Sequence, residues 1–247
     1  MNSFLDALEF LTIFSFPSKR SPEIIRIGRS GTYFPLVGLM LGGVLVGANW
    51  LCSWLFPPEI VSALLVLLLV ILTRGIHLDG LSDSADALLG GHDPKERLLI
   101  MKDSSIGAFG AIAIFFALLF KFLFLNSLPH QIIDVSLILM ITLSRWSLVI
   151  MSFLGRSARA DGLGSIFTEH TGYAQIILAT LITLVIGFVF LGLSSLIPII
   201  ALLLLAILVI SGVSRMTGGI TGDILGGFAE ISEILCLAII YVLTVIS

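Results

Sequence analysis

Three aspartates stand close together where a long apolar stretch gives way to polar residues. They are Asp79, Asp83 and Asp86, in the segment HLDGLSDSAD at residues 77–86. Positions i, i+4 and i+7 share one face of a helix, so the three carboxylates are predicted to lie side by side. Such a cluster repels itself unless a cation lies among its oxygens, and oxygen ligands suit Mg²⁺, Mn²⁺ or Ca²⁺ better than zinc. The spacing favours a divalent-metal site; the alternative is a solvated acidic face.

The neighbours of the acids suggest a phosphate ligand. His77 lies two residues before Asp79 and is a candidate for substrate binding, although a lone histidine is more often a structural hydrogen bonder. Further on, Lys102 and Asp103 directly precede a predicted helix start in KDSSIGAFG. Free N–H groups and the dipole at a helix start can hold an anion, and a lysine adds a positive charge. Together with the acids, this pattern predicts a metal–phosphate site.

Two glycine-rich polar segments offer further candidates. In residues 155–173, GRSARADGLGSIFTEHTGY, Arg156 is a candidate for binding an anionic substrate, and an ordinary mobile loop explains the segment equally well. In residues 214–228, the core TGGITGD holds Asp223, a fourth candidate carboxylate that together with Asp103 is a candidate proton acceptor. Glycine allows the backbone to approach a ligand closely. The substrate-binding candidates of this core are Gly218, Gly219, Thr221 and Gly222.

The composition predicts a polytopic membrane protein. Of 247 residues, 57% are hydrophobic and 12% are charged, and the mean hydropathy is +1.14; soluble domains average about 25% charged. The basic residues form no stripe that would suit a nucleic acid. Cys52 and Cys236 lie in apolar runs without the spacing of a metal site, so small buried hydrophobes are expected there.

The fold expected is an all-α, integral membrane helical bundle, a single domain over residues 1–247. A helix needs about 20 apolar residues to cross the bilayer, and about seven segments qualify: 33–56, 59–75, 107–125, 132–154, 174–193, 196–213 and 229–247. Lysine and arginine concentrate before the first span and in loops 76–106, 155–173 and 214–228, while connections 57–58, 126–131 and 194–195 have none. By the positive-inside rule the basic loops and the acids face the cytoplasm.

Two charges within the predicted spans need separate explanations. Arg145 lies about nine residues, or roughly 13 Å, inside span 132–154. An arginine at that depth faces a bundle interior or a cavity, so substrate contact is favoured over a structural acid partner. Lys121 is placed near the outer end of its span, where it can reach the interface, and is given no role.

Two features flank or lie within the first span. Phe4, Leu5, Leu8 and Leu11 recur at helical spacing, which predicts an N-terminal interfacial helix. Span 33–56 contains two overlapping GxxxG patterns, formed by Gly38, Gly42, Gly43 and Gly47. Such patterns allow close helix packing, favoured within one chain, with a homo-oligomer as the alternative.

The polar segments together resemble a known enzyme family. HLDGLSDSADALLGG, ERLLIMKDSSIGAFGAI and GGITGDILGG are similar to the signature stretches of cobalamin synthase, the adenosylcobinamide-GDP ribazoletransferase family, and the N-terminal LEFLTIFSFP and GTYFPLVGLMLGG are also similar. The resemblance covers nearly the whole chain in the same order.

The resemblance implies an enzyme of the cytoplasmic (inner) membrane. It implies Mg²⁺-dependent transfer of the phosphocobinamide group of adenosylcobinamide-GDP to α-ribazole or its 5′-phosphate, releasing GMP. In that reading Asp79, Asp83 and Asp86 bind the metal, and Lys102 neutralises phosphate charge.

Three other classes remain as alternatives. A CDP-alcohol phosphatidyltransferase would pair Asp-Gly with an Ala-Arg that is missing after Gly80, and a prenyltransferase would need a second equal acid cluster. An ion-coupled transporter would place acids near the bilayer midplane, whereas here only Arg145 is expected to lie deep.

Overall fold

Helices account for the regular structure of the chain. The computed structural model describes residues 2–15 and 24–246, and within them it contains no strand, only an isolated bridge between Ser157 and Ile220. The all-α prediction is therefore confirmed. The elements are α1 (Asn2–Leu11), α2 (Ile24–Arg29), η1 (Ser30–Tyr33), α3 (Phe34–Ser53), α4 (Pro58–Leu72), α5 (Ile76–Gly90), α6 (Pro94–Ile100), α7 (Ala108–Ser127), α8 (His130–Leu154), α9 (Leu163–His170), α10 (Tyr173–Leu191), η2 (Gly192–Ser195), α11 (Leu196–Thr217) and α12 (Gly222–Ile246).

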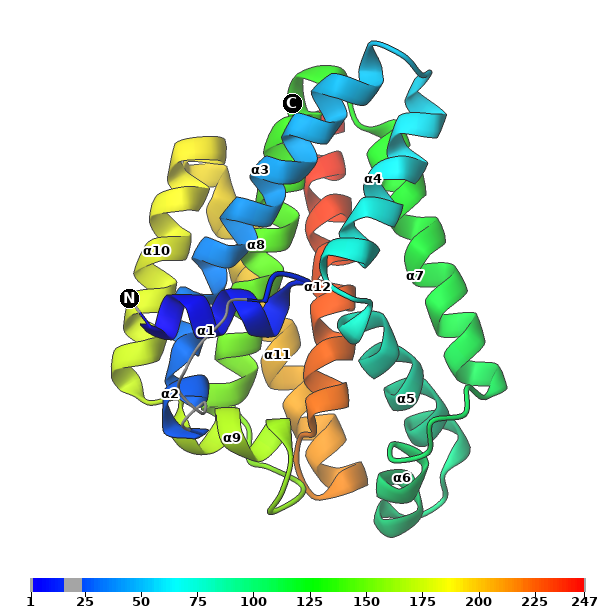
Figure 1. The fold of residues 1–247 in the computed structure, drawn as a ribbon, viewed down its shortest axis with the longest axis vertical. Helices are drawn as coiled ribbons and strands as arrows, with labels where there is room; N and C mark the ends of the chain where they lie inside the picture. Colours follow the sequence, from blue (N-terminus) through cyan, green and yellow to red (C-terminus); the bar gives the residue numbers. More distant parts are fainter. Residues whose placement is uncertain (1, 16–23, 247) are drawn as a thin grey trace.

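Helix α8 forms the centre of the bundle, with α3, α10, α11 and α12 packed around it (Figure 1). Every residue from Ser136 to Ser152 is buried. Glycines bring α3 close to it, since a Cβ at Gly38 would lie 2.7 Å from the Cα of Thr142. Gly42 makes the same kind of contact, so this GxxxG pattern packs within the chain, as predicted.

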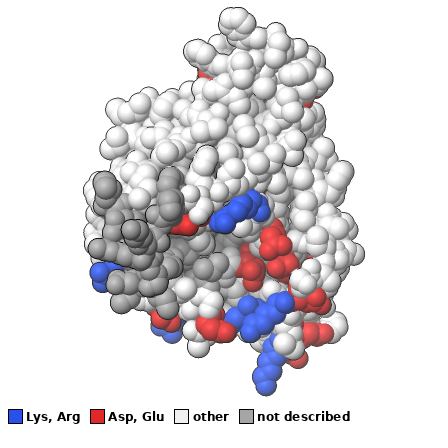
Figure 2. Space-filling view, viewed as in Figure 1, with Lys and Arg blue, Asp and Glu red and all other residues white. Residues whose placement is uncertain are grey.

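The long helices suit a membrane in length and composition. The described residues contain five helical segments apolar and long enough to cross one, or up to six if the bent pair α4–α5 counts as one span. One of the five is Tyr173–Thr217, 45 residues long, whose helices α10 and α11 run in opposite directions (Figure 1). The chain is thus a multi-pass membrane bundle, and the predicted count of seven is not confirmed. Lys, Arg, Asp and Glu gather toward the lower end of the face in Figure 2, and the upper part is almost uncharged.

The second predicted span ends early, and the chain turns there. Helix α4 stops at Leu72, and α5 starts at Ile76 after an 88° bend. The turn uses left-handed backbone at Arg74 (φ +55°) and Gly75 (φ +65°). The segment predicted as loop 76–106 therefore begins with a 15-residue helix. The spacing of Asp79, Asp83 and Asp86 had predicted a helical face within this segment, and the structure shows how far that helix extends.

The N-terminal helix α1 is present as predicted and lies across the long helices (Figure 1). Its apolar residues Ala7, Leu8 and Leu11 are buried against the protein. The guanidinium of Arg74 donates to the carbonyl of Glu9 at 3.1 Å and that of Phe10 at 3.4 Å. These bonds satisfy carbonyls at the end of α1 and hold it against the α4–α5 bend.

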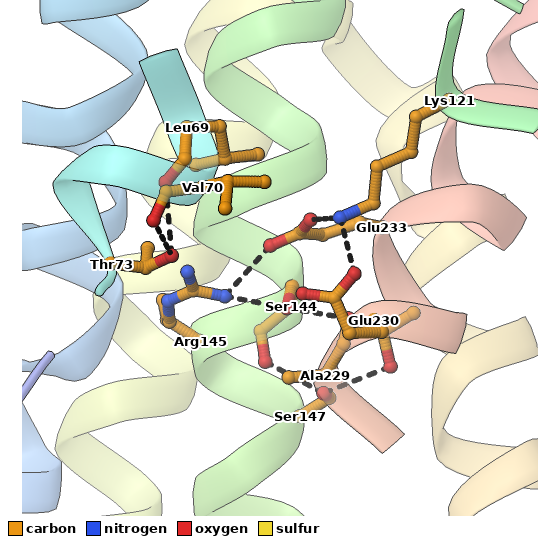
Figure 3. Close-up of polar contacts among 11 residues, drawn as sticks. Leu69, Val70, Thr73, Lys121, Ser144, Arg145, Ser147, Ala229, Glu230 and Glu233 are labelled. Carbon is orange, nitrogen blue, oxygen red and sulfur yellow. Dashed lines mark hydrogen bonds and ion pairs between the residues drawn. The ribbon is translucent and has the colours of Figure 1, made fainter. Parts of the chain in front are cut away.

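Four charged side chains meet inside the bundle (Figure 3). Lys121 of α7 is paired with Glu230 at 2.6 Å and with Glu233, both on α12, and Arg145 of α8 is paired with Glu233 at 2.8 Å. We call these four residues the buried charge network. The expectation that Lys121 reaches the interface is wrong, since the side chain is 1% exposed. A carboxylate partner keeps the charge inside the protein, and that partner lies 109 or 112 residues away in sequence.

Helix α12 begins earlier than predicted, and its glycines pack against α5. It starts at Gly222 rather than 229, so most of the predicted loop 214–228 is helical. A Cβ on Gly80 of α5 would lie 2.7 Å from the carbonyl oxygen of Asp223, and one on Gly226 would lie 3.3 Å from the Cα of His77. Gly227 faces α5 in the same way. The glycines admit another helix at this point, where a ligand was expected for the segment.

Replacing Glu233 with glutamine is expected to destabilise the protein strongly. The change leaves Arg145 without its carboxylate partner and Lys121 with one, and breaking a buried pair costs about 3–5 kcal/mol. Reversible unfolding in mixed micelles measures the loss. Glu59→Gln, an exposed acid in the first turn of α4, is the control and should change stability little. A similar small effect for both variants would contradict the role of the network.

Gly80→Ala is expected to weaken the contact between α5 and α12. The added methyl would meet the Asp223 backbone, and overpacking of this kind costs about 1–3 kcal/mol. The matched control is Gly43→Ala in α3, where a Cβ has nothing within 4 Å. Thermal unfolding of both variants in detergent tests this, and equal midpoints would show that the close approach is not required.

Candidate active site

A cavity of about 590 Å³ opens where α1, the α4–α5 bend, α8, the segment before α9 and the start of α12 meet. Segments from both ends of the chain line it, so folding assembles it from remote parts of the sequence. Its lining residues are Phe10, Phe34, Arg74, Ile76, His77, Asp79, Leu148, Ser152, Ser157, Arg159, Asp161, Gly162, Gly164, Phe167, Thr221, Gly222, Asp223, Leu225 and Gly226.

Five of the residues predicted for the site meet in this cavity: His77, Asp79, Thr221, Gly222 and Asp223. The glycine contact between α5 and α12 brings the two groups together. The Thr221 hydroxyl accepts from the backbone N–H of Ile224 at 3.2 Å and donates to the Asp223 carboxylate at 3.3 Å. It thereby caps the start of α12 and orients the carboxylate.

The histidine of this group is buried yet has an unused ring nitrogen. His77 is 3% exposed, and its Nδ1 has no hydrogen-bond partner among the described residues. A buried polar atom without a partner is costly. His77 also belongs to the cavity lining, so this unsatisfied group lies at the candidate site.

The three aspartates of α5 have different surroundings. Asp79 is exposed and lines the cavity. Asp83, four residues further along α5, is half-buried and is not among the lining residues. Burial, followed by the nearby carboxylates of Asp79 and Asp223, raises the pKa of Asp83 to about 6. Helix α5 is not itself among the five spanning segments. The repulsion that the spacing predicted is therefore present, and a bound cation would relieve it.

Asp86 serves as the anion at the start of α7. Its carboxylate accepts from the N–H of Gly107 at 2.8 Å and of Gly110 at 2.9 Å. A Cβ at Gly110 would lie 2.3 Å from the carboxylate, so only glycine leaves room for it. The N–H groups that were predicted to hold a phosphate are thus occupied by Asp86 itself.

No ready-made metal cage is present in the parts of the chain that are described. No group of three or more His, Cys, Asp or Glu side chains there is arranged to hold one metal ion. Asp79 and Asp83, however, make no hydrogen bond to the described protein that would occupy their oxygens, whereas those of Asp86 are in use. Their oxygen chemistry fits a hard cation that takes its other ligands from substrate or water.

Lys102 and Asp103 lie outside the cavity, exposed between α6 and α7. The backbone N–H of Ser105 donates to the Asp103 carboxylate at 3.0 Å. This bond, with a second contact from the Ser105 side chain, lowers the pKa of Asp103. Asp103 is therefore stabilised as a carboxylate in a turn outside the cavity, although its charge still reaches Asp83.

Arg145 and the pair Gly218–Gly219 also lie elsewhere. Arg145 is fully buried with its ion-pair partner Glu233, so the acid partner that the sequence reading ranked second is the one observed. Gly218 ends α11 in a left-handed conformation (φ +82°). Gly219 lies against the backbone of Arg156, where a Cβ would be 2.5 Å from the carbonyl oxygen.

Arg156 lines a neighbouring hollow of about 430 Å³ rather than the main cavity. The two hollows share Ser157 and Arg159. Backbone bonds fix this segment to the start of α12, from the Ile220 N–H to the Arg156 carbonyl at 2.7 Å and from the Ala158 N–H to the Ile220 carbonyl at 2.9 Å. The two glycine-rich segments thus form one surface.

The sequence left several lining residues unassigned. Both Arg156 and Arg159 of segment 155–173 suited an anionic substrate, but only Arg156 was chosen as a site residue, and Asp161 was given no role. Arg159 donates to the Leu98 carbonyl at 2.6 Å and faces the same cavity as Asp79. Arg74 and the aromatic lining residues gave no signal, because they come from separate parts of the chain and belong to no common motif.

The arrangement suits the handling of a phosphorylated ligand. Carboxylates from α5 and α12 can hold a cation, and Arg74 and Arg159 can pair with phosphate oxygens. The buried wall beside them excludes water, which strengthens such interactions.

Comparison with known proteins gives a consistent result. The profile of a family described as cobalamin-5-phosphate synthase matches residues 3–241. A protein named adenosylcobinamide-GDP ribazoletransferase from Geotalea daltonii is 36% identical over 231 residues, covering 94% of this chain and 93% of that protein. One of the same name from Desulfitobacterium hafniense is 39% identical over 236 residues, with 94% and 93% covered.

No solved structure matches the chain. The family profile nevertheless covers nearly the entire sequence, including both acid-bearing segments of the cavity and the glycines that join them. The chain is therefore a transferase that belongs to the cobalamin synthase family.

Proposed function

We propose that this protein joins the two halves of adenosylcobalamin. The phosphocobinamide group of adenosylcobinamide-GDP is transferred to α-ribazole or α-ribazole 5′-phosphate, GMP leaves, and adenosylcobalamin or its 5′-phosphate forms. The observation that carries this proposal is the meeting of Asp79 and Asp223, from two distant motifs of the family, in one cavity with His77 and two arginines.

Phosphoryl transfer needs positioning and charge neutralisation more than covalent participation by the protein. A ribose hydroxyl of the acceptor attacks the phosphorus that bears cobinamide, and the bond from that phosphorus to the GMP oxygen breaks. Arg74 and Arg159 would neutralise the diphosphate from the cavity wall. Asp223 would accept the hydroxyl proton; of the two acids considered for this role, Asp103 lies outside the cavity.

Asp79 and Asp83 would hold Mg²⁺. Asp86, the third acid of the set, has its oxygens in use as acceptors from Gly107 and Gly110. The metal would supply neutralisation of the charge that develops on the leaving phosphate. This assignment is supported by the free oxygens of the first two residues and by the raised pKa of Asp83. We place this site at the cytoplasmic face of the inner membrane, since the basic residues of the sequence concentrate in the same loops.

Purified protein in detergent is expected to release GMP from adenosylcobinamide-GDP when α-ribazole and Mg²⁺ are both present. Omission of α-ribazole or chelation of the metal should stop the release. Chromatography of the nucleotide and the corrinoid product measures the reaction. Verified substrates that yield no GMP would refute the assignment, and transport of a solute into liposomes without its consumption would support the transporter class.

Asp79→Asn and Asp83→Asn are each expected to lower turnover by at least about 100-fold, because loss of one charge-stabilising group at a reacting phosphate has effects of this size. Raising Mg²⁺ should recover part of the activity. The matched control is Asp93→Asn, an exposed N-cap of α6, where asparagine caps equally well. Near-normal turnover of the first two variants at limiting Mg²⁺ would exclude them as metal ligands.

A further inference from the structure

Three phenylalanines of the cavity lining contact one another, and we call them the aromatic wall: Phe10 of α1, Phe34 of α3 and Phe167 of α9. The ring centroids of Phe10 and Phe34 are 5.9 Å apart, those of Phe10 and Phe167 are 4.9 Å apart, and those of Phe34 and Phe167 are 5.4 Å apart. Each ring thus touches both others. Phe34 and Phe167 are buried, at 2% and 3% exposure, and Phe10 is partly exposed.

The polar side of the cavity is formed by residues of other helices. It includes Asp79 and the buried His77 of α5, whose Nδ1 has no partner among the described residues, and Asp223 of α12. The cavity therefore suits a ligand with an apolar aromatic end and a polar end that bears hydroxyls. Its volume of about 590 Å³ lies within the range of roughly 300–1,000 Å³ typical of small-molecule pockets.

The two proposed substrates differ in how well their size and polarity match the cavity. At one end of adenosylcobinamide-GDP, the corrin ring with its side chains is far larger than a drug-sized ligand. At the other end, the guanine has a carbonyl, a ring N–H and an amino group that need hydrogen bonds. Phenylalanine side chains offer none, and an unpaired polar edge costs binding energy. The dimethylbenzimidazole of α-ribazole is flat and apolar apart from one ring nitrogen, and its ribose carries the hydroxyls.

We propose that the aromatic wall is the base subsite for α-ribazole. The benzimidazole packs against Phe10, Phe34 and Phe167, and the ribose points to the polar side, where its attacking hydroxyl meets Asp79 and Asp223. The bulky donor then enters from the open side with only its diphosphate inside. This inference rests on the proposed function, because it takes α-ribazole as the acceptor.

The test compares two phenylalanines of the same helix. Phe10→Leu keeps an apolar side chain but removes a ring from the wall. Phe4→Leu is the matched control, since Phe4 also lies on α1 and contacts another ring, that of Tyr33 at 6.0 Å, but does not line the cavity. Initial rates of GMP release are measured while each substrate is varied in turn.

Phe10→Leu is expected to raise KM for α-ribazole about tenfold, in line with the loss of a stacking contact to a base. KM for adenosylcobinamide-GDP and kcat should change less than twofold, and Phe4→Leu should change none of these values. Equal KM values for α-ribazole in Phe10→Leu and wild type would overturn the proposed subsite. A rise in KM for adenosylcobinamide-GDP alone would also overturn it. Wild-type protein that releases no GMP would instead defeat the proposed function itself.

A measurement on the wild-type protein covers the case in which Phe10→Leu does not fold. Free 5,6-dimethylbenzimidazole is expected to inhibit GMP release competitively against α-ribazole and not against adenosylcobinamide-GDP. Competition against adenosylcobinamide-GDP alone, or no inhibition up to the solubility limit, would overturn the proposal.

Discussion

The candidate site depends on the direct backbone contact between α5 and α12. Gly80 lies against the backbone of Asp223, and Gly226 and Gly227 lie against α5. Any side chain at Gly80 would push the helices apart and separate Asp79 from Asp223, two of the acids that line the cavity. The same contact explains why two polar motifs about 140 residues apart belong to one site. The glycines that seemed suited to a ligand serve first to admit a helix.

The buried charge network holds α12 where this contact requires it. Lys121 and Arg145 bring α7 and α8 to the same helix through Glu230 and Glu233. Deep charges count as a sign of a transporter, and the sequence argument against that class assumed that only Arg145 lay deep. The assumption was wrong, but the charges are paired with each other inside the protein. Family membership, rather than the depth of charge, identifies the chain as an enzyme.

The cavity is lined by polar residues and by an aromatic wall. The sequence predicted several of the polar residues and none of the phenylalanines. The polar side is built from short motifs, where Asp79, Thr221 and Asp223 stand out against apolar surroundings. Phe10, Phe34 and Phe167 are three among 17 phenylalanines in a hydrophobic chain. Nothing local distinguishes them, because a phenylalanine has the same character in the sequence whether it faces lipid, core or ligand.

The sequence by itself determined the helical membrane class and the family, because hydropathy and residue type are written along the chain. The tertiary structure alone decided the bend at Gly75, the pairing of Lys121 and the use of Asp86 as a helix cap. Each of these depends on a partner remote in sequence, and a partner's position is fixed only when the helices pack.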